Sequence, residues 1–225
     1  MLSEQQGSRK ILASSFCRVY NGEHLYTEKE DYIMAREFEL KFRASARQMT
    51  AIMEDYSGFR EINMETTYYD TPEQSLLPRR WTLRCRTENG VSVCALKTPC
   101  AEGGRCEWET ECPDITAAIP ALCDLGAPEE LKALTAAGLE AVCGARFVRQ
   151  AALIEADGCT VELALDRGIL KGGARIVLLG EVEVELKSGN EQEVLLFSRV
   201  LEHKFGLTPE PRSKFRRALD LAKGE

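Results

Sequence analysis

Long apolar runs are missing from this sequence of 225 residues. No uncharged apolar stretch approaches the roughly 20 residues that a membrane-spanning helix needs. The first nine residues also lack the basic-then-apolar layout of a secretory signal. We therefore expect a cytoplasmic protein that has no membrane partner.

An excess of basic residues is missing as well. Lys and Arg number 29 against 36 Asp and Glu, which gives a formal net charge of −7 at pH 7. Proteins that bind nucleic acid through the phosphate backbone usually carry a net basic domain. No nucleic-acid partner is expected, although local basic clusters can still bind a small anion.

Metal-thiolate motifs are absent despite nine cysteines, because no C-x-x-C spacing occurs and only two histidines are available. Structural zinc sites need short, paired Cys or His spacings. The alternative, which agrees with a reducing compartment, is that all the cysteines are free thiols.

The organisation changes near Met34. Residues 1–33 show no sustained period of 2 or 3.6, whereas strong alternation begins at Glu37. We predict a flexible N-terminal extension over 1–33 and a single domain over 34–225. A short docking segment that uses Ile11, Leu12, Phe16 and Tyr20 is the alternative for the extension.

Short alternating runs dominate the domain, with few helices between them. Ser45 and Gln48 form a capping-box signature, and Asn89-Gly90 is a hairpin signal. Asn190 is expected to cap a long helix whose buried face holds Leu196, Val200, Leu201 and Phe205. Two short helices within 114–140 and one over Ser213–Ala222 complete the helical set. The expected strands are Glu37–Phe42, Glu65–Asp70, Thr82–Thr87, Val91–Thr98, Arg105–Glu111, Phe147–Glu155, Thr160–Asp166, Arg175–Val177 and Glu181–Lys187.

Charged residues occupy one face of most of these strands. A solvated outer face would explain any single strand, but rows of like charge on neighbouring strands cost stability. A closed barrel with apolar residues outside, covered by helices, and a charged lumen explains the whole set better. The aligned residues are Glu37, Glu39 and Lys41; Arg84 and Arg86; Lys97; Arg105, Glu107, Glu109 and Glu111; Glu162 and Asp166; and Glu181, Glu183 and Glu185.

A lumen with both signs of charge indicates a particular class of ligand. Arg and Lys bind phosphate oxygens, and carboxylates bind hard cations that bridge to phosphate. Neither set would tolerate burial without a counter-charge. The pattern therefore implies a polyphosphate together with a divalent metal.

These residues resemble the CYTH, or triphosphate tunnel metalloenzyme, superfamily. The resemblance rests on an ordered series: E-x-E-x-K at Glu37–Lys41, R-x-R at Arg84–Arg86, Lys97, the pair Arg105 and Glu107, Arg149, Asp166, a second E-x-E at Glu183–Glu185, and Lys214. It covers 34–222. It implies an α+β, mostly β fold: a closed eight-stranded antiparallel β-barrel, the triphosphate tunnel, with helices packed outside.

The resemblance also implies roles for individual residues. Phosphate would be bound by Lys41, Arg84, Arg86, Lys97, Arg149 and Lys214, and Mg²⁺ or Mn²⁺ by Glu37, Glu39, Glu107, Asp166, Glu183 and Glu185. Lys97 is also the candidate catalytic group, since it could protonate or polarise the leaving oxygen. Arg105, Arg146, Glu109, Glu162 and Glu181 would be supporting charges.

The implied activity is metal-dependent hydrolysis of inorganic triphosphate or another small triphosphate. The sequence is most like bacterial inorganic triphosphatases, without the C-terminal CHAD domain that many of them carry. Three alternatives stay open: an adenylyl cyclase of class IV type, a thiamine triphosphatase, and a non-catalytic polyphosphate or nucleotide binder. The oligomeric state is undetermined.

Trp81 lies an odd number of residues from Arg84, so we expect it on the opposite face of its strand, packed under a helix.

Overall fold

The structure is a computed structural model that describes residues 38–100 and 105–224. Glu37 and the proposed extension over 1–33 lie outside these residues, so both remain predictions. The strands are β1 (Glu39–Arg43), β2 (Arg60–Asp70), β3 (Thr82–Glu88), β4 (Val91–Pro99), β5 (Arg105–Glu111), β6 (Glu140–Ala156), β7 (Cys159–Gly172), β8 (Arg175–Gly189) and β9 (Thr208–Pro209). The helices are α1 (Ala46–Asp55), α2 (Ile115–Asp124), α3 (Glu130–Leu134), α4 (Glu191–Phe205) and α5 (Lys214–Lys223), with 3₁₀ turns η1 (Leu77–Arg79) and η2 (Thr135–Ala137).

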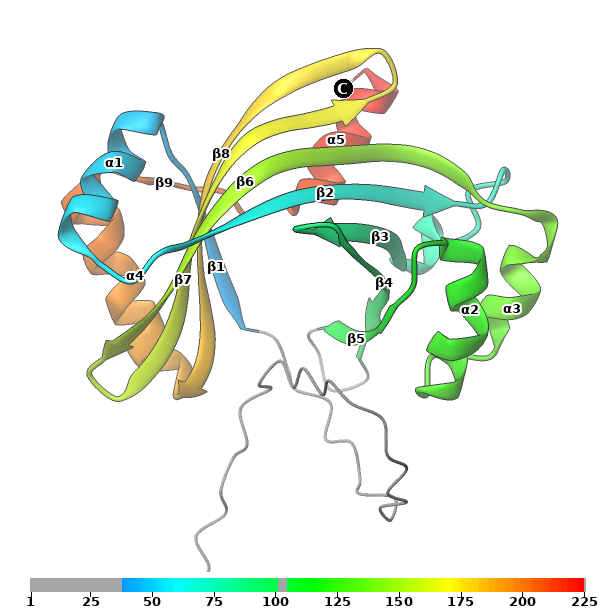
Figure 1. Cartoon of the computed structure of the whole chain (residues 1–225), viewed down its shortest axis with the longest axis horizontal. Coiled ribbons are helices and arrows are strands. Elements are labelled where there is room, and N and C mark those ends of the chain that lie inside the picture. The colour runs from blue at the N-terminus through cyan, green and yellow to red at the C-terminus, as the bar shows by residue number, and fades with distance from the viewer. Residues whose placement is uncertain (1–37, 101–104, 225) are drawn as a thin grey trace, which may run out of the picture.

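All the strands belong to one antiparallel sheet with the order β5-β4-β3-β2-β6-β7-β8-β1-β9. The sheet is strongly curved, and β3, β4 and β5 bend beneath the long arch of β2 and β6 (Figure 1). Within the described residues, no backbone pairing joins β5 at one edge to β1 or β9 at the other. The predicted mostly β, antiparallel architecture is confirmed, but the predicted closed, eight-stranded barrel is not: across residues 38–100 and 105–224 the sheet has nine strands, and no hydrogen bonds close it.

Two apolar layers cover the convex face of the sheet. Under α1 and α4, the outward residues of β1, β7 and β8 form a core that includes Phe42, Leu163 and Val184. Under α2 and α3, the outward residues of β3 and β4 form a second core that includes Leu83 and Leu96. Period-2 alternation therefore turns the intervening residues to the concave face.

Helix α5 packs on the concave side, contrary to the expectation that all helices lie outside. Its Phe215, Ala218 and Leu219 contact Tyr68 and Phe147, which come from β2 and β6. The approach of α5 to the sheet requires a glycine, since a Cβ at residue 172 would lie 2.2 Å from the Ala218 carbonyl oxygen. The sequence shows that α5 is amphipathic but not which face of the sheet it covers.

Local signals in the sequence are confirmed where a few neighbouring residues decide the geometry. Ser45 and Gln48 form the reciprocal capping box at the start of α1. Asn89 and Gly90 both have positive φ, 48° and 90°, in the tight turn between β3 and β4.

Two other expectations are wrong. Cys100 and Cys106, expected as free thiols, form a disulfide with a Cα–Cα distance of 5.3 Å. The antiparallel pairing of β4 and β5 places Thr98 opposite Cys106, so both cysteines lie at the same end of this strand pair. On α4, the predicted buried face is wrong for Leu196 and Val200, which are exposed, and confirmed for Leu201, which is buried, and Phe205, which packs against the core; Val194 and Ser198 are buried as well. None of the helices in the described segments combines the length and apolar character that crossing a membrane would require.

Candidate active site

The charged residues predicted from alternation lie together on the concave face. The register pairs Lys41 with Glu183, Arg149 with Asp166, and Lys97 with Glu107. Their chain neighbours turn outward; Cys85, between Arg84 and Arg86, packs against the core under α2 and α3. The assignment of faces from the sequence is therefore confirmed for the described strands.

A basic group is formed by Arg84 and Arg86 on β3 and Lys97 on β4. Glu107 on β5 contacts two of its members: its Oε1 accepts from Arg84 Nη2 at 2.9 Å, and its Oε2 lies 2.9 Å from Lys97 Nζ. Burial raises the pKa of Glu107, but the charges of Arg84 and Lys97 outweigh it and lower the pKa below its usual value. Glu107 is thus a counter-ion to the basic group.

Arg86 shows that positive charge is concentrated here. Its pKa is lowered, first by burial and second by the neighbouring charge of Arg84. Its carboxylate partner is Glu88, whose Oε1 lies 2.6 Å from Arg86 Nε. Two guanidinium groups on one shielded face form a site that favours an anion such as phosphate.

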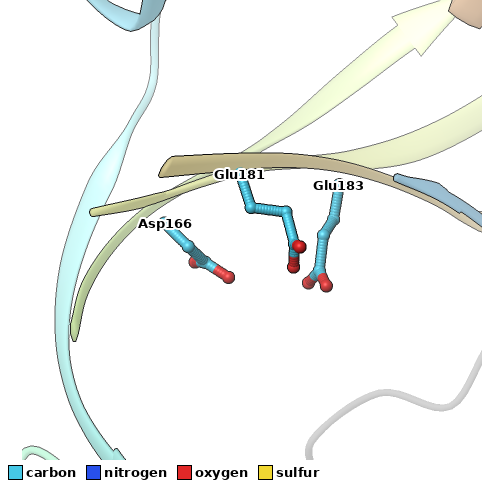
Figure 2. Close-up of side chains that lie close together, drawn as sticks. All are labelled: Asp166, Glu181 and Glu183. Atoms are coloured by element: carbon cyan, nitrogen blue, oxygen red, sulfur yellow. The ribbon is translucent and has the colours of Figure 1, made fainter. Parts of the chain in front are cut away.

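An acidic cluster lies on β7 and β8, where Asp166, Glu181 and Glu183 each place one carboxylate oxygen within 4.8 Å of the others. Figure 2 shows the three side chains extending from the sheet into the same space. Lys214 Nζ, from α5, lies 2.7 Å from Asp166 and 2.7 Å from Glu183, and it also contacts Glu181. Arg149 contacts Asp166 through two hydrogen bonds of 2.7 Å and contacts Glu183 as well.

Burial and charge act in opposite directions on this cluster. Burial alone would lower the pKa of Lys214, but the charges of Asp166, Glu183 and Glu181 raise it above its usual value. Glu183 contacts both Lys214 and Arg149, which outweigh its burial and hold its pKa well below the usual range. Burial is the larger effect at Glu181, where it raises the pKa to about 7 in spite of Lys214.

A second set of carboxylates, which we call the carboxylate row, crosses three strands. Glu185 on β8 is directly opposite Glu39 on β1 and Glu162 on β7. Like charges placed opposite one another on neighbouring strands repel. Carboxylates are the hard oxygen donors that divalent cations such as Mg²⁺ and Mn²⁺ prefer.

The carboxylates of the acidic cluster are paired with basic side chains. Each of its three carboxylates contacts Lys214, and Arg149 and Arg217 supply two further positive charges. Within the carboxylate row, Glu39 contacts Lys41 at 2.5 Å, Glu185 contacts Lys187 at 2.8 Å, and Glu162 lies 3.8 Å from Arg60. Both sets of carboxylates therefore lie beside basic side chains.

Tyr68 lies between the basic group and the acidic cluster. It is opposite Arg84 in the β2–β3 register, and its ring centroid is 5.0 Å from that of Phe215, which follows Lys214 in α5. Burial raises the pKa of Tyr68, which stays a neutral spacer at ordinary pH. The two charged groups thus border one concave surface.

The structure places every predicted site residue except Glu37, which lies outside the described residues. Glu107 and Asp166, predicted as metal ligands, accept hydrogen bonds from Arg84 and Arg149, and their role as metal ligands stays a prediction. Arg105 donates to the carbonyl oxygens of Arg80 and Lys97 and so supports the strand ends. Arg146 was expected near the site but is not there. It lies three residues before Arg149 on β6, so it is exposed on the convex face.

Sequence reasoning underrated Glu181 and missed Arg217. Glu181 is 0% exposed, and Arg217 Nη1 donates to its Oε2 at 2.6 Å. The missed signal is helical spacing, since Arg217 follows Lys214 by three residues and shares its side of α5.

Comparison with known proteins finds a curated relative. The chain is 27% identical over 192 residues to an inorganic triphosphatase of Haemophilus influenzae, a match that covers 82% of this chain but only 54% of the relative. The chain therefore spans about half the length of that relative.

Solved structures support the fold. A Hippeastrum protein described as a candidate adenylyl cyclase with a dominant triphosphatase activity has a TM-score of 0.59, with 18% identity over 85% of this chain and 97% of its own. A Pyrococcus horikoshii protein has a TM-score of 0.55, with 21% identity over 82% of this chain and 99% of its own. The family model for the CYTH domain matches residues 35–219, and the chain belongs to the CYTH family.

Proposed function

We propose that the protein is a divalent-metal-dependent hydrolase of inorganic triphosphate or another small triphosphate. The observation that carries the proposal is the presence of a basic group and a carboxylate row on one concave face. A polyphosphate with a bound cation carries both signs of charge and complements both groups. The similarity to a triphosphatase of Haemophilus influenzae supports the same activity.

Arg84, Arg86 and Lys97 would bind one end of the polyphosphate, and Lys41, Arg149 and Lys214 the other. Guanidinium groups can donate two hydrogen bonds to one phosphate, which fixes its orientation as well as its charge. The side chains of Arg84, Arg86 and Lys97 are 15%, 16% and 16% exposed, so the bonds would form in a partly shielded site.

Glu39 and Glu185 would hold Mg²⁺ or Mn²⁺, with Glu37 and Glu183 as further ligands. The carboxylate row supplies the hard oxygen donors that these ions prefer. When bound, the ion would neutralise phosphate charge and lower the pKa of a bound water. Glu107 and Asp166, the other expected ligands, would also hold the phosphate-binding cations in place.

The reaction would be attack of water on a terminal phosphorus, which breaks one phosphoanhydride bond and yields phosphate and pyrophosphate. Such a transfer depends mainly on positioning and charge stabilisation by the protein. Lys97 would donate a proton or a hydrogen bond to the leaving oxygen, and its contact with Glu107 would orient it.

The position of Trp81 supports inorganic triphosphate over thiamine triphosphate as the proposed substrate. Trp81 is 8% exposed and packs in the core under α2 and α3, as its spacing from Arg84 predicts. It is therefore not available to stack on a thiamine ring or a nucleobase. Inorganic triphosphate needs no such contact.

Phosphate release from inorganic triphosphate, ATP and thiamine triphosphate, with and without Mg²⁺ or Mn²⁺, tests the proposal. We expect metal-dependent release that is fastest with inorganic triphosphate. Formation of cyclic AMP from ATP would indicate a cyclase instead. Tight binding of all three compounds without turnover would indicate a non-catalytic binder.

A further inference from the structure

Arg217 is a buried cation for which the proposed reaction gives no role. It lies on α5, one turn after Lys214, and its side chain is 12% exposed. Nη1 donates to Glu181 at 2.6 Å, and Nε lies 3.9 Å from Glu210. Its guanidinium therefore bridges two carboxylates that are almost fully buried.

The three carboxylates around Lys214 share one property: each also contacts a second cation. Asp166 and Glu183 contact Arg149, and Glu181 contacts Arg217. Each oxygen of Glu181 has its own partner, since Lys214 contacts Oε1 and Arg217 contacts Oε2. The cluster is built so that no carboxylate depends on Lys214 alone.

Lys214 cannot bind a substrate without giving up one of these contacts. An ammonium group has three N–H donors, and Lys214 faces three carboxylates. If Lys214 turned to a phosphate oxygen, the carboxylate that it left would be a buried charge. An unpaired buried charge is strongly destabilising, so the exchange requires a second cation at that carboxylate.

We infer that Arg217 is a positioning residue that keeps Glu181 neutralised while Lys214 exchanges Glu181 for a phosphate oxygen of the substrate. The inference rests on the proposed phosphate-binding role of Lys214. Among the described residues, Lys214 would then be the one cation left in contact with Glu181 if Arg217 were removed. The charge of Glu181 would hold Lys214 away from the ligand.

The test measures tripolyphosphate binding in EDTA by calorimetry, and KM and kcat for triphosphate hydrolysis with Mg²⁺, at pH 8.5. Arg217→Ala is expected to weaken metal-free binding and to raise KM about tenfold, the equivalent of one charged hydrogen bond, with a much smaller change in kcat. Arg217→Lys should recover part of this loss, because it restores the charge without the second donor. Arg216→Ala is the matched control, because Arg216 is an exposed neighbour that pairs with Asp220 at 2.7 Å.

Two double variants separate positioning from simple structural support. Arg217→Ala combined with Glu181→Gln should bind tripolyphosphate nearly as well as Glu181→Gln alone, since residue 181 then carries no negative charge that Arg217 would have to neutralise. In a Lys214→Ala background, Arg217→Ala should have no further effect on binding. If Arg217→Ala is too unstable to study, Arg217→Lys and the Arg217→Ala, Glu181→Gln double variant carry the test.

The inference is overturned if Arg217→Ala binds tripolyphosphate like the unsubstituted chain. It is equally overturned if Glu181→Gln gives no recovery, or if the loss is as large without Lys214. Binding of tripolyphosphate by the unsubstituted chain without hydrolysis would refute the proposed function but leave the inference intact. Absence of binding would refute both.

Discussion

Replacing Arg86 by alanine tests the anion site most directly. Its side chain is 16% exposed and lies beside Arg84 on the concave face, where its charged form is disfavoured by burial and by the charge of Arg84. A phosphate in contact with it would gain a charged hydrogen bond, which contributes about 1.5–3 kcal/mol. At about 1.4 kcal/mol for each factor of ten, kcat/KM for triphosphate should fall about 10- to 100-fold in Arg86→Ala.

The matched control is Arg146→Ala, since Arg146 is an exposed arginine on the opposite, convex face of the same sheet. We expect this variant to keep normal kcat/KM in a steady-state phosphate-release assay. Arg86→Lys should recover only part of the activity, because an ammonium lacks the planar fork. The midpoint of thermal unfolding of Arg86→Ala should change little, since loss of the Glu88 pair is offset by relief of repulsion from Arg84. Equal losses of kcat/KM in Arg86→Ala and Arg146→Ala would refute the assignment of the concave face.

Alternation along single strands was sufficient to predict which residues face the site. Glu39 and Lys41 lie on the concave face while Phe42 enters the core under α1 and α4. The same rule separates Arg84 from Cys85. A strand has only two faces, so a few residues fix the orientation of all the others.

Partners across strands could not be predicted in this way, because they depend on strand order and on the curvature of the sheet. The family resemblance implies a metal-ligand role for Glu107 but says nothing of its neighbours, which are Lys97, directly opposite it in the β4–β5 register, and Arg84. Lys214 is likewise expected as a separate phosphate ligand, and its position in the acidic cluster becomes visible only once α5 is placed on the sheet. The side of the sheet that a helix covers is a tertiary property that spacing within the helix does not determine.

Element lengths were predicted poorly where alternation lapses. Arg175–Val177 and Glu181–Lys187 were expected as separate strands, but both belong to β8, Arg175–Gly189. The run Leu178-Leu179-Gly180 interrupts the period of 2 without interrupting the pairing with β7. Sheet pairing here overrides the local pattern.

Three further predictions follow from the carboxylates. Glu39→Gln and Glu185→Gln should raise the Mg²⁺ concentration needed for half-maximal turnover, because each removes a proposed ligand charge. Neither should lower the unfolding midpoint in EDTA, since both relieve repulsion within the carboxylate row. Unchanged Mg²⁺ dependence in both variants would contradict the metal assignment. Glu107→Gln should lower the unfolding midpoint in phosphate-free buffer, since Arg84 and Lys97 lose their shared counter-ion. Added tripolyphosphate should restore the midpoint. A midpoint that tripolyphosphate does not raise would show that no anion binds to the basic group. The last concerns Glu181, whose pKa burial raises from 4.5 to about 7 in the folded protein. The folded state then binds more protons than the unfolded state between these values, so the free energy of unfolding should fall as pH rises from about 4.5 to about 7, by at most about 1.4 kcal/mol per pH unit. Urea unfolding at several pH values in EDTA measures this slope, which Glu181→Gln should reduce; an equal slope in both proteins would show that Glu181 is already ionised throughout this range, held so by Lys214 and Arg217.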